Sequence, residues 1–102
     1  MKKILASIIV ALSLVSCSDE LTKTLPYVLT TATTGGTFYP VGVAIATIVH
    51  AKLSESHALS LTAISSAGSL ENIKLLRDNQ AQFALLTGPF AAWSWSGEGP
   101  VS

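Results

Sequence analysis

The feature that most constrains the fold is a pattern that occurs three times along residues 27–95: a β-prone run, a short loop, and a run with helical spacing or a helix start signal. Strands that alternate with helices predict parallel pairing, because parallel neighbours must be joined by a crossover of about a dozen residues. The sequence therefore predicts an α/β fold, in which a βαβαβ open parallel sheet is followed by a last short helix.

The first unit begins with a strand candidate, Tyr27–Thr31, and continues into a Gly/Thr-rich loop that we place at Thr33–Tyr39. Pro40 suits the first turn of a helix, where its missing N–H has no partner to lose. From Val41 to Leu53 apolar residues recur at helical spacing, which predicts one core-facing stripe. Its members are Val41, Ile45, Ile48, Val49 and Leu53.

The second unit consists of a strand candidate, Leu59–Ile64, a loop over Ser65–Ser69, and an amphipathic helix that opens at Ser69. The residues expected to face the core are Leu70, Ile73, Leu75 and Leu76, and those expected to face water are Glu71, Lys74, Arg77 and Asp78. The third unit has a strand candidate, Gln82–Thr87, then a loop over Thr87–Pro89 and a short helical segment over Phe90–Trp95.

The loops that follow parallel strands converge on one edge of the sheet, beside helix N-termini, and ligands bind there. The main chain can approach a ligand closely at Gly35-Gly36. The first two loops also offer hydroxyl donors, namely Thr34, Thr37, Ser65, Ser66 and Ser69. Such neutral donors suit an anion such as a carboxylate. The plainer alternative is that Gly35-Gly36 is only a tight turn and Ser69 only a helix cap. The arrival of three loops at one edge favours a ligand.

Catalytic chemistry finds little support in the sequence. His50 and His57 lie in or just after the first helix, away from the loops. No Cys/His cluster has metal-ligand spacing, no serine lies in a nucleophile elbow, and Gly35-Gly36 lacks the rest of a nucleotide-binding motif. We therefore expect no catalytic residue, no metal and no cofactor. Trp93 and Trp95 could stack on a ligand, but packing is the favoured interpretation.

The N-terminal residues predict an export signal. Lys2 and Lys3 precede an apolar run, Ile4–Val15, that is shorter than the roughly 20 residues of a membrane span. Leu14-Val15-Ser16-Cys17 resembles the bacterial lipobox, in which the cysteine is lipidated and the chain is cut before it. The resemblance implies a signal peptide over residues 1–16 and a lipidated tether over 17–26. The alternatives are a short membrane anchor or a buried helix in place of the signal peptide, and an incidental cysteine in place of the lipidation site.

Export across the inner membrane and a lipid on Cys17 would place the protein in the periplasm or at the cell surface, anchored to a membrane. Removal of residues 1–16 leaves four basic against six acidic side chains. This charge balance does not favour nucleic acid as a partner.

Three stretches resemble one family. They are Thr34-Gly35-Gly36-Thr37-Phe38-Tyr39-Pro40-Val41-Gly42, Gly68-Ser69-Leu70-Glu71-Asn72-Ile73-Lys74-Leu75-Leu76 and Ala81-Gln82-Phe83-Ala84-Leu85-Leu86. They are similar to the TAXI family, the extracytoplasmic solute receptors of tripartite ATP-independent periplasmic (TRAP) transporters. The first stretch is the most specific, since the family typically reads Thr-Gly-Gly-Thr-Tyr-Tyr-Pro.

The resemblance implies the N-terminal lobe of a type II periplasmic-binding-protein fold. It implies a receptor, not an enzyme, that captures glutamate, glutamine or a dicarboxylate for TRAP permease subunits in the membrane. Carried onto this chain, the family's ligand contacts fall on Gly36, Thr37, Tyr39, Ser69 and Asn72. Together with the loop donors, the expected ligand-binding set is Thr34, Gly35, Gly36, Thr37, Tyr39, Ser69 and Asn72.

The chain departs from the family pattern in three ways. Phe38 replaces a tyrosine, and Thr87-Gly88-Pro89 stands where the family has a polar stretch. Family receptors are also much longer, so residues 27–102 are expected to form a partial solute-binding lobe of a truncated chain. Two other functions stay open at this point: a ligand-sensing lipoprotein of a signalling system, and a non-binding surface lipoprotein.

Overall fold

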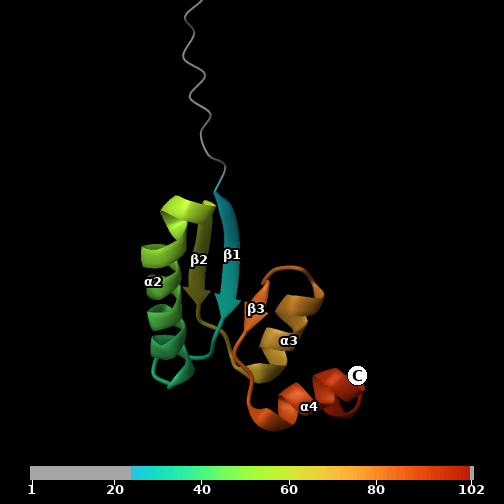
Figure 1. Cartoon of the computed structure of the whole chain (residues 1–102). Coiled ribbons are helices and arrows are strands. Elements are labelled where there is room, and N and C mark those ends of the chain that lie inside the picture. The colour runs from blue at the N-terminus through green and yellow to red at the C-terminus, as the bar shows by residue number, and fades with distance from the viewer. Residues whose placement is uncertain (1–23, 102) are drawn as a thin grey trace, which may run out of the picture.

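The computed structural model describes residues 24–101 (Figure 1). The predicted signal peptide, Cys17 and most of the predicted tether lie outside the described residues. The secondary-structure elements are β1 (Leu25–Thr30), α2 (Phe38–His57), β2 (Leu59–Ile64), α3 (Ser69–Arg77), β3 (Phe83–Ala84), α4 (Gly88–Ser96) and the 3-10 helix η1 (Gly99–Val101). The predicted order of strands and helices is confirmed.

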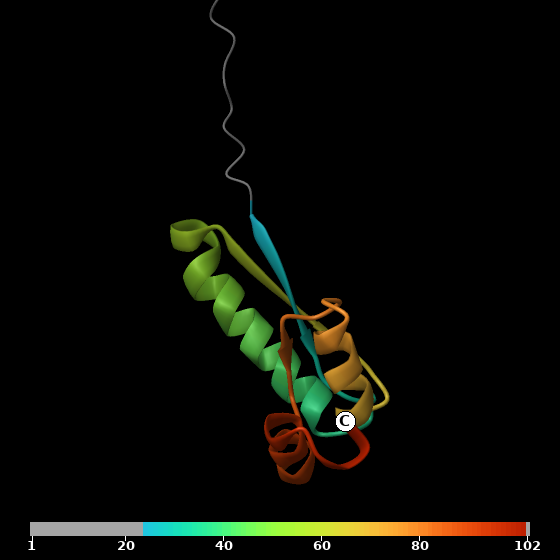
Figure 2. The same cartoon turned by 90° about the vertical axis from the view of Figure 1, so that its right-hand side faces the viewer.

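The sheet has the order β2-β1-β3, and β1 pairs in parallel with both neighbours. The last residue of β1, Thr30, lies opposite Ile64 of β2 and Ala84 of β3. The chain moves from β1 to β2 in one direction and then crosses back over β1 to reach β3. Because such crossovers are right-handed, the two helices lie on opposite faces of the sheet. Figure 2 shows α2 on one side of the strands and α3 on the other.

β1 begins at Leu25, two residues before the predicted start and within the predicted tether. Leu25 N donates to Ala58 O at 2.8 Å, which ties the start of β1 to β2. Pro26 is the next residue, so its nitrogen points to the opposite side, where β3 pairs only with Leu29 and Thr30. Proline is tolerated there because no strand faces it and no ladder hydrogen bond is lost.

α2 is longer than predicted at both ends, and a glycine sets its distance from the sheet. Pro40 is its third residue, within the first turn whose N–H groups have no intrahelical partners. Gly42 is buried against β1, and a Cβ atom there would lie 2.4 Å from Thr31 Cγ2. The lack of a side chain at Gly42 therefore allows the first turns of α2 to pack closely on the end of β1.

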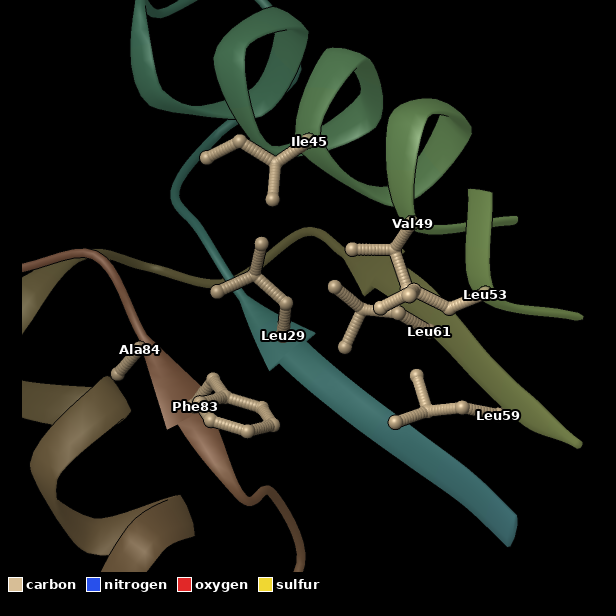
Figure 3. Close-up of a pocket in the computed structure, with 8 residues that line it drawn as sticks. All are labelled: Leu29, Ile45, Val49, Leu53, Leu59, Leu61, Phe83 and Ala84. Atoms are coloured by element: carbon tan, nitrogen blue, oxygen red, sulfur yellow. The ribbon is translucent and has the colours of Figure 1, made fainter. Parts of the chain in front are cut away.

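The predicted apolar stripe of α2 is only partly correct. Ile45, Val49 and Leu53 face the sheet (Figure 3), although Ile45 remains 38% exposed. Val41 and Ile48 remain 44% and 62% exposed, so their predicted core positions are wrong. The reason is the close approach at Gly42. Because Gly42 faces the sheet, its neighbour Val41 points away from the sheet, and Ile48 lies on the outer face of the helix.

α3 begins at Ser69 as predicted, and Ile73 is its buried apolar residue. Leu70 is 37% exposed, against expectation, and Asn72 faces the core in its place. The four charged residues of this segment are exposed, as predicted. β3 is two residues long, much shorter than the predicted Gln82–Thr87, and α4 extends beyond both ends of its predicted range.

The apolar core of the lobe is small. In the described part of the chain, the buried hydrophobic residues are Leu29, Ile73 and Ala81. No helix within residues 24–101 has both the length and the apolar character that crossing a membrane requires.

Candidate functional site

The three predicted loops meet where the parallel strands end. Thr31 N donates to Ile64 O at 3.0 Å, and Ser66 N donates to Ala32 O at 3.1 Å. From the third segment, Leu85 N donates to Thr30 O at 3.0 Å. The expected convergence is therefore confirmed for the main chain. We call the ends of β1 and β3 together with residues 31–37, 65–68 and 85–87 the carboxyl edge.

Asn72 on α3 joins all parts of this edge, and its side chain is fully buried. Its Oδ1 accepts hydrogen bonds from Thr30 Oγ1 at 2.7 Å and from Ser66 Oγ at 2.6 Å. Its Nδ2 donates to Thr31 O at 2.6 Å and to Leu85 O at 2.8 Å. Carbonyl oxygens can only accept, so the chemistry of the partners fixes the orientation of this amide.

The hydrogen bonds of Asn72 account for its full capacity of two donors and one doubly accepting oxygen. Burial of a polar group is costly unless it is hydrogen-bonded, and no buried side-chain nitrogen or oxygen within residues 24–101 lacks a partner. Thr31 is equally buried, and its Oγ1 donates to Ile64 O at 2.7 Å. The structure thus gives Asn72 a structural role, with its hydrogen bonds made within the lobe.

Ser69, the first residue of α3, links the second loop to the third. Its Oγ accepts a hydrogen bond from Thr87 N at 3.0 Å and lies 3.5 Å from Thr87 Oγ1. Sequence reasoning did not single out Thr87. The signal that could have found it is its place directly before Gly-Pro at a helix start, where the first N–H groups need partners.

The first loop is the most accessible part of the carboxyl edge. Thr34, Gly35 and Thr37 are exposed, whereas Gly36 and Tyr39 are half-buried. Gly36 N donates to Thr33 O at 2.9 Å, so a turn brings the loop back toward α2. A Cβ atom at Gly35 would have no neighbour within 4 Å. The space beside this glycine is therefore open to an incoming ligand.

The helix N-termini at the carboxyl edge differ in whether an acidic side chain lies beside them. In α3, the carboxylate of Glu71 accepts a hydrogen bond from Ala67 N. A carboxylate at this position stabilises the positive end of the helix dipole. Neither α2 nor α4 has an acidic residue in its first turn, and Thr37 before α2 makes no side-chain cap hydrogen bond. The positive dipole end of α2 is therefore without an acidic partner of its own.

Titratable residues contribute little to this region. His57 is the last residue of α2, at the end of the sheet opposite the carboxyl edge, and its Nδ1 lies 2.7 Å from Ser56 Oγ. In the part of the chain that the structure describes, no group of three or more His, Cys, Asp or Glu side chains could hold a metal ion.

A second feature of the lobe is a cavity of about 440 Å³ between α2 and the sheet, which we call the apolar groove (Figure 3). It is lined only by apolar residues: Leu29, Ile45, Val49, Leu53, Leu59, Leu61, Phe83 and Ala84. Binding sites for small molecules usually add a few polar groups that orient the ligand. The lining of the apolar groove offers no such side chain, so it resembles an incompletely covered core.

The aromatic residues of α4 divide between packing and exposure. Phe90 and Trp93 pack edge to face with ring centroids 5.3 Å apart, whereas Trp95 is 94% exposed. Packing, the favoured interpretation of the sequence, thus describes Trp93 and leaves Trp95 without a described role.

Comparison with known proteins identifies the family. The NMT1-like family matches residues 29–102, well over half of the chain. No curated protein and no solved structure gives a significant match. The matched region includes β2, β3, the last two residues of β1 and the whole carboxyl edge. The parallel α/β sheet is compatible with a periplasmic-binding-like lobe, and the chain belongs to the NMT1-like family, a family related to periplasmic binding proteins.

Proposed function

We propose that this protein is an extracytoplasmic solute receptor of the TAXI type, which captures a small carboxylate for the permease of a TRAP transporter. The observation that carries the proposal is the meeting of three uncharged, hydroxyl-bearing loops at the carboxyl edge of a chain from a substrate-binding family. In open α/β sheets this is where ligands bind.

The ligand carboxylate would bind at the first loop. Thr34 and Thr37 are exposed and can donate from their hydroxyls, and the open space beside Gly35 lets the main chain approach the ligand. The dipole of α2 favours negative charge at the same place. At α3, by contrast, Glu71 already supplies a carboxylate. We therefore place the anion at α2 and give Ser69 a supporting contact.

The mechanism is binding without a chemical step. Neutral donors hold a carboxylate without the desolvation cost of a buried cation. Closure of a second lobe over the ligand and docking to the permease would complete transport. The proposal includes a lipid on Cys17 that keeps the receptor at a membrane surface, because acyl chains contribute about 0.8 kcal/mol per buried CH₂.

The experiment is calorimetry and thermal shift on the full chain, and on the chain extended by any downstream coding sequence. The probes are glutamate, glutamine and C4 to C5 dicarboxylates. Thr37→Ala and Tyr39→Ala are expected to abolish binding. Thr47→Ala is the matched control, because Thr47 is an exposed hydroxyl on α2 that donates to Val43 O within the helix at 2.9 Å.

Binding that survives in Thr47→Ala and disappears in Thr37→Ala supports the proposal. If neither the full chain nor the extended chain binds any of these carboxylates, the proposed receptor function is wrong. The non-binding surface lipoprotein is then the favoured function. The lipid is tested separately by metabolic labelling with a fatty acid. Label is expected on the wild-type chain and not on Cys17→Ser, and an unlabelled wild-type chain overturns the anchor.

A further inference from the structure

We infer that Asn72 is a positioning residue, which touches no ligand and holds the three loops of the carboxyl edge in their binding arrangement. The inference rests on the proposed function, since it concerns the same edge. It assigns Asn72 a different task from the ligand contact that the resemblance implies.

The partners of Asn72 come from each of the strand ends and loops that form the edge. Thr30 and Thr31 belong to the end of β1 and the loop after it, 42 and 41 residues away along the chain. Ser66 belongs to the loop after β2, and Leu85 to the segment after β3. One buried side chain thus contacts all of these segments, whereas the hydroxyls of Thr31 and Ser69 each join only two of them.

The network continues from Asn72 to the groups that would meet a ligand. Ser66 Oγ, which donates to Asn72, also accepts from Gly68 N at 3.1 Å, directly before α3. The third loop is held at two points: Leu85 O by Asn72 and Thr87 N by Ser69 Oγ. Asn72 therefore acts on Ser69 and Thr87 through the main chain of these loops.

Among neutral side chains of this size, only a carboxamide offers two N–H donors to carbonyl oxygens and an oxygen that accepts from two hydroxyls. A loop that must be ordered when the ligand arrives loses affinity, because the ordering cost is subtracted from the binding free energy. Loss of Asn72 is therefore expected to weaken ligand binding while the fold persists.

The test uses the full chain with Asn72→Ala, and Lys74→Ala as the matched control. Lys74 lies on the same helix and is exposed. Alanine favours helix, so neither change weakens α3 through its intrinsic propensity. Hydrogen exchange is followed by mass spectrometry in peptides that cover residues 31–37, 65–68 and 85–88, with residues 41–57 of α2 as the internal reference. Glutamate affinity is measured by calorimetry at a temperature where circular dichroism shows both variants folded.

For Asn72→Ala we expect exchange in the three loop peptides to rise about tenfold or more and glutamate to bind about tenfold more weakly, with α2 unchanged. Lys74→Ala should match the wild type. Unchanged loop exchange overturns the inference. So does a uniform rise across β1, α2 and the loops, because that result shows only a general loss of stability.

If Asn72→Ala does not fold, Thr30→Val provides the second test. It removes the hydrogen bond from Thr30 Oγ1 to Asn72 Oδ1 with little change in size, and exchange is expected to rise in residues 31–37. Unchanged exchange there overturns the inference. A chain whose wild type binds none of the tested carboxylates contradicts the proposed function. The exchange data still decide the role of Asn72 in that case, so the two failures are distinguishable.

Discussion

At the carboxyl edge the side chains of Thr30, Thr31 and Asn72 are fully buried, whereas in the apolar groove Phe83 and Ile45 keep 51% and 38% of their surface exposed. In most domains apolar side chains are buried and polar ones are exposed. In this lobe the polar edge is closed by hydrogen bonds and the apolar face is open. The directional contacts are therefore concentrated beneath the loops where the ligand is proposed to bind.

The difference follows from what each region has to satisfy. Buried polar groups need partners in fixed directions, so the carboxyl edge has one arrangement. The groove needs only apolar area, which another apolar surface can supply without fixed geometry. We therefore expect changes to the buried side chains of the carboxyl edge to cost more free energy of unfolding than changes of similar size in the groove.

The strongest way to break this comparison is Asn72→Asp. A carboxylate oxygen would replace the Nδ2 group that faces Thr31 O and Leu85 O. We expect a loss of about 3–5 kcal/mol in the free energy of unfolding at pH 7. The measurement is urea denaturation of both chains.

The loss should also depend on pH. Repulsion from the two carbonyl oxygens would raise the folded-state pKa of the new acid above its ordinary value of about 3.9. The folded state then binds the proton more tightly than the unfolded state, so the loss is full at neutral pH and shrinks as pH falls through the folded pKa. A loss that does not change with pH would contradict the hydrogen bonds assigned to Nδ2.

Gly42→Ala tests how tightly the carboxyl edge is packed. The new methyl group would lie 2.4 Å from Thr31 Cγ2, and Thr31 cannot rotate without losing its hydrogen bond to Ile64 O. Overpacking costs about 1–3 kcal/mol, and the helix preference of alanine recovers up to about 1 kcal/mol. We expect a net loss of about 1–2 kcal/mol by thermal denaturation. Gly35→Ala, whose Cβ meets no atom, is the control and should leave stability nearly unchanged.

Phe83→Ala tests the groove. Full burial makes such a change cost about 3–5 kcal/mol. Because Phe83 is 51% exposed and packs edge to face on Tyr27 with ring centroids 5.8 Å apart, we expect a loss of only about 1 kcal/mol in chemical denaturation. A loss as large as that of Asn72→Asp would show that the groove is a closed core in solution.

Trp95→Ser should have the smallest effect. This residue is 94% exposed, and such surface changes stay within about 0.5 kcal/mol. Tryptophan fluorescence offers the measurement, because removal of Trp95 leaves the half-buried Trp93 as the emitter and should shift the emission to shorter wavelength. Emission that does not shift would show that Trp95 is covered.

The succession of strands and helices along the chain was predictable because it depends on local periodicity. Whether an individual residue faces the core or the solvent was harder to predict. Val41 and Ile48 are exposed because Gly42 packs closely on Thr31. This contact arises only when helix and strand meet. β3 was predicted too long because its apolar sequence continues past Ala84, although Asn72 already binds Leu85 O.

The sequence was enough to predict which loops form the candidate site, but not the role of each residue in it. The first loop forms part of the carboxyl edge, and Ser69 and Asn72 of α3 contact this edge, as the pattern of strands and loops predicted. The sequence could not show that Asn72 points into the sheet and Thr34 toward solvent, because that difference depends on how two crossovers align. Whether Thr34, Thr37 and Tyr39 contact a ligand stays a prediction.

The central place of β1 also sets an order of assembly. β1 and β2 can pair around α2 early, but Val28 meets its partner Gln82 only 54 residues later along the chain. Contacts so distant in sequence form slowly, because loop closure must precede them. We expect the hydrogen bonds of Asn72 to form last during folding and to open first under stress. The proposed binding function would then be lost before the β1–α2–β2 unit unfolds.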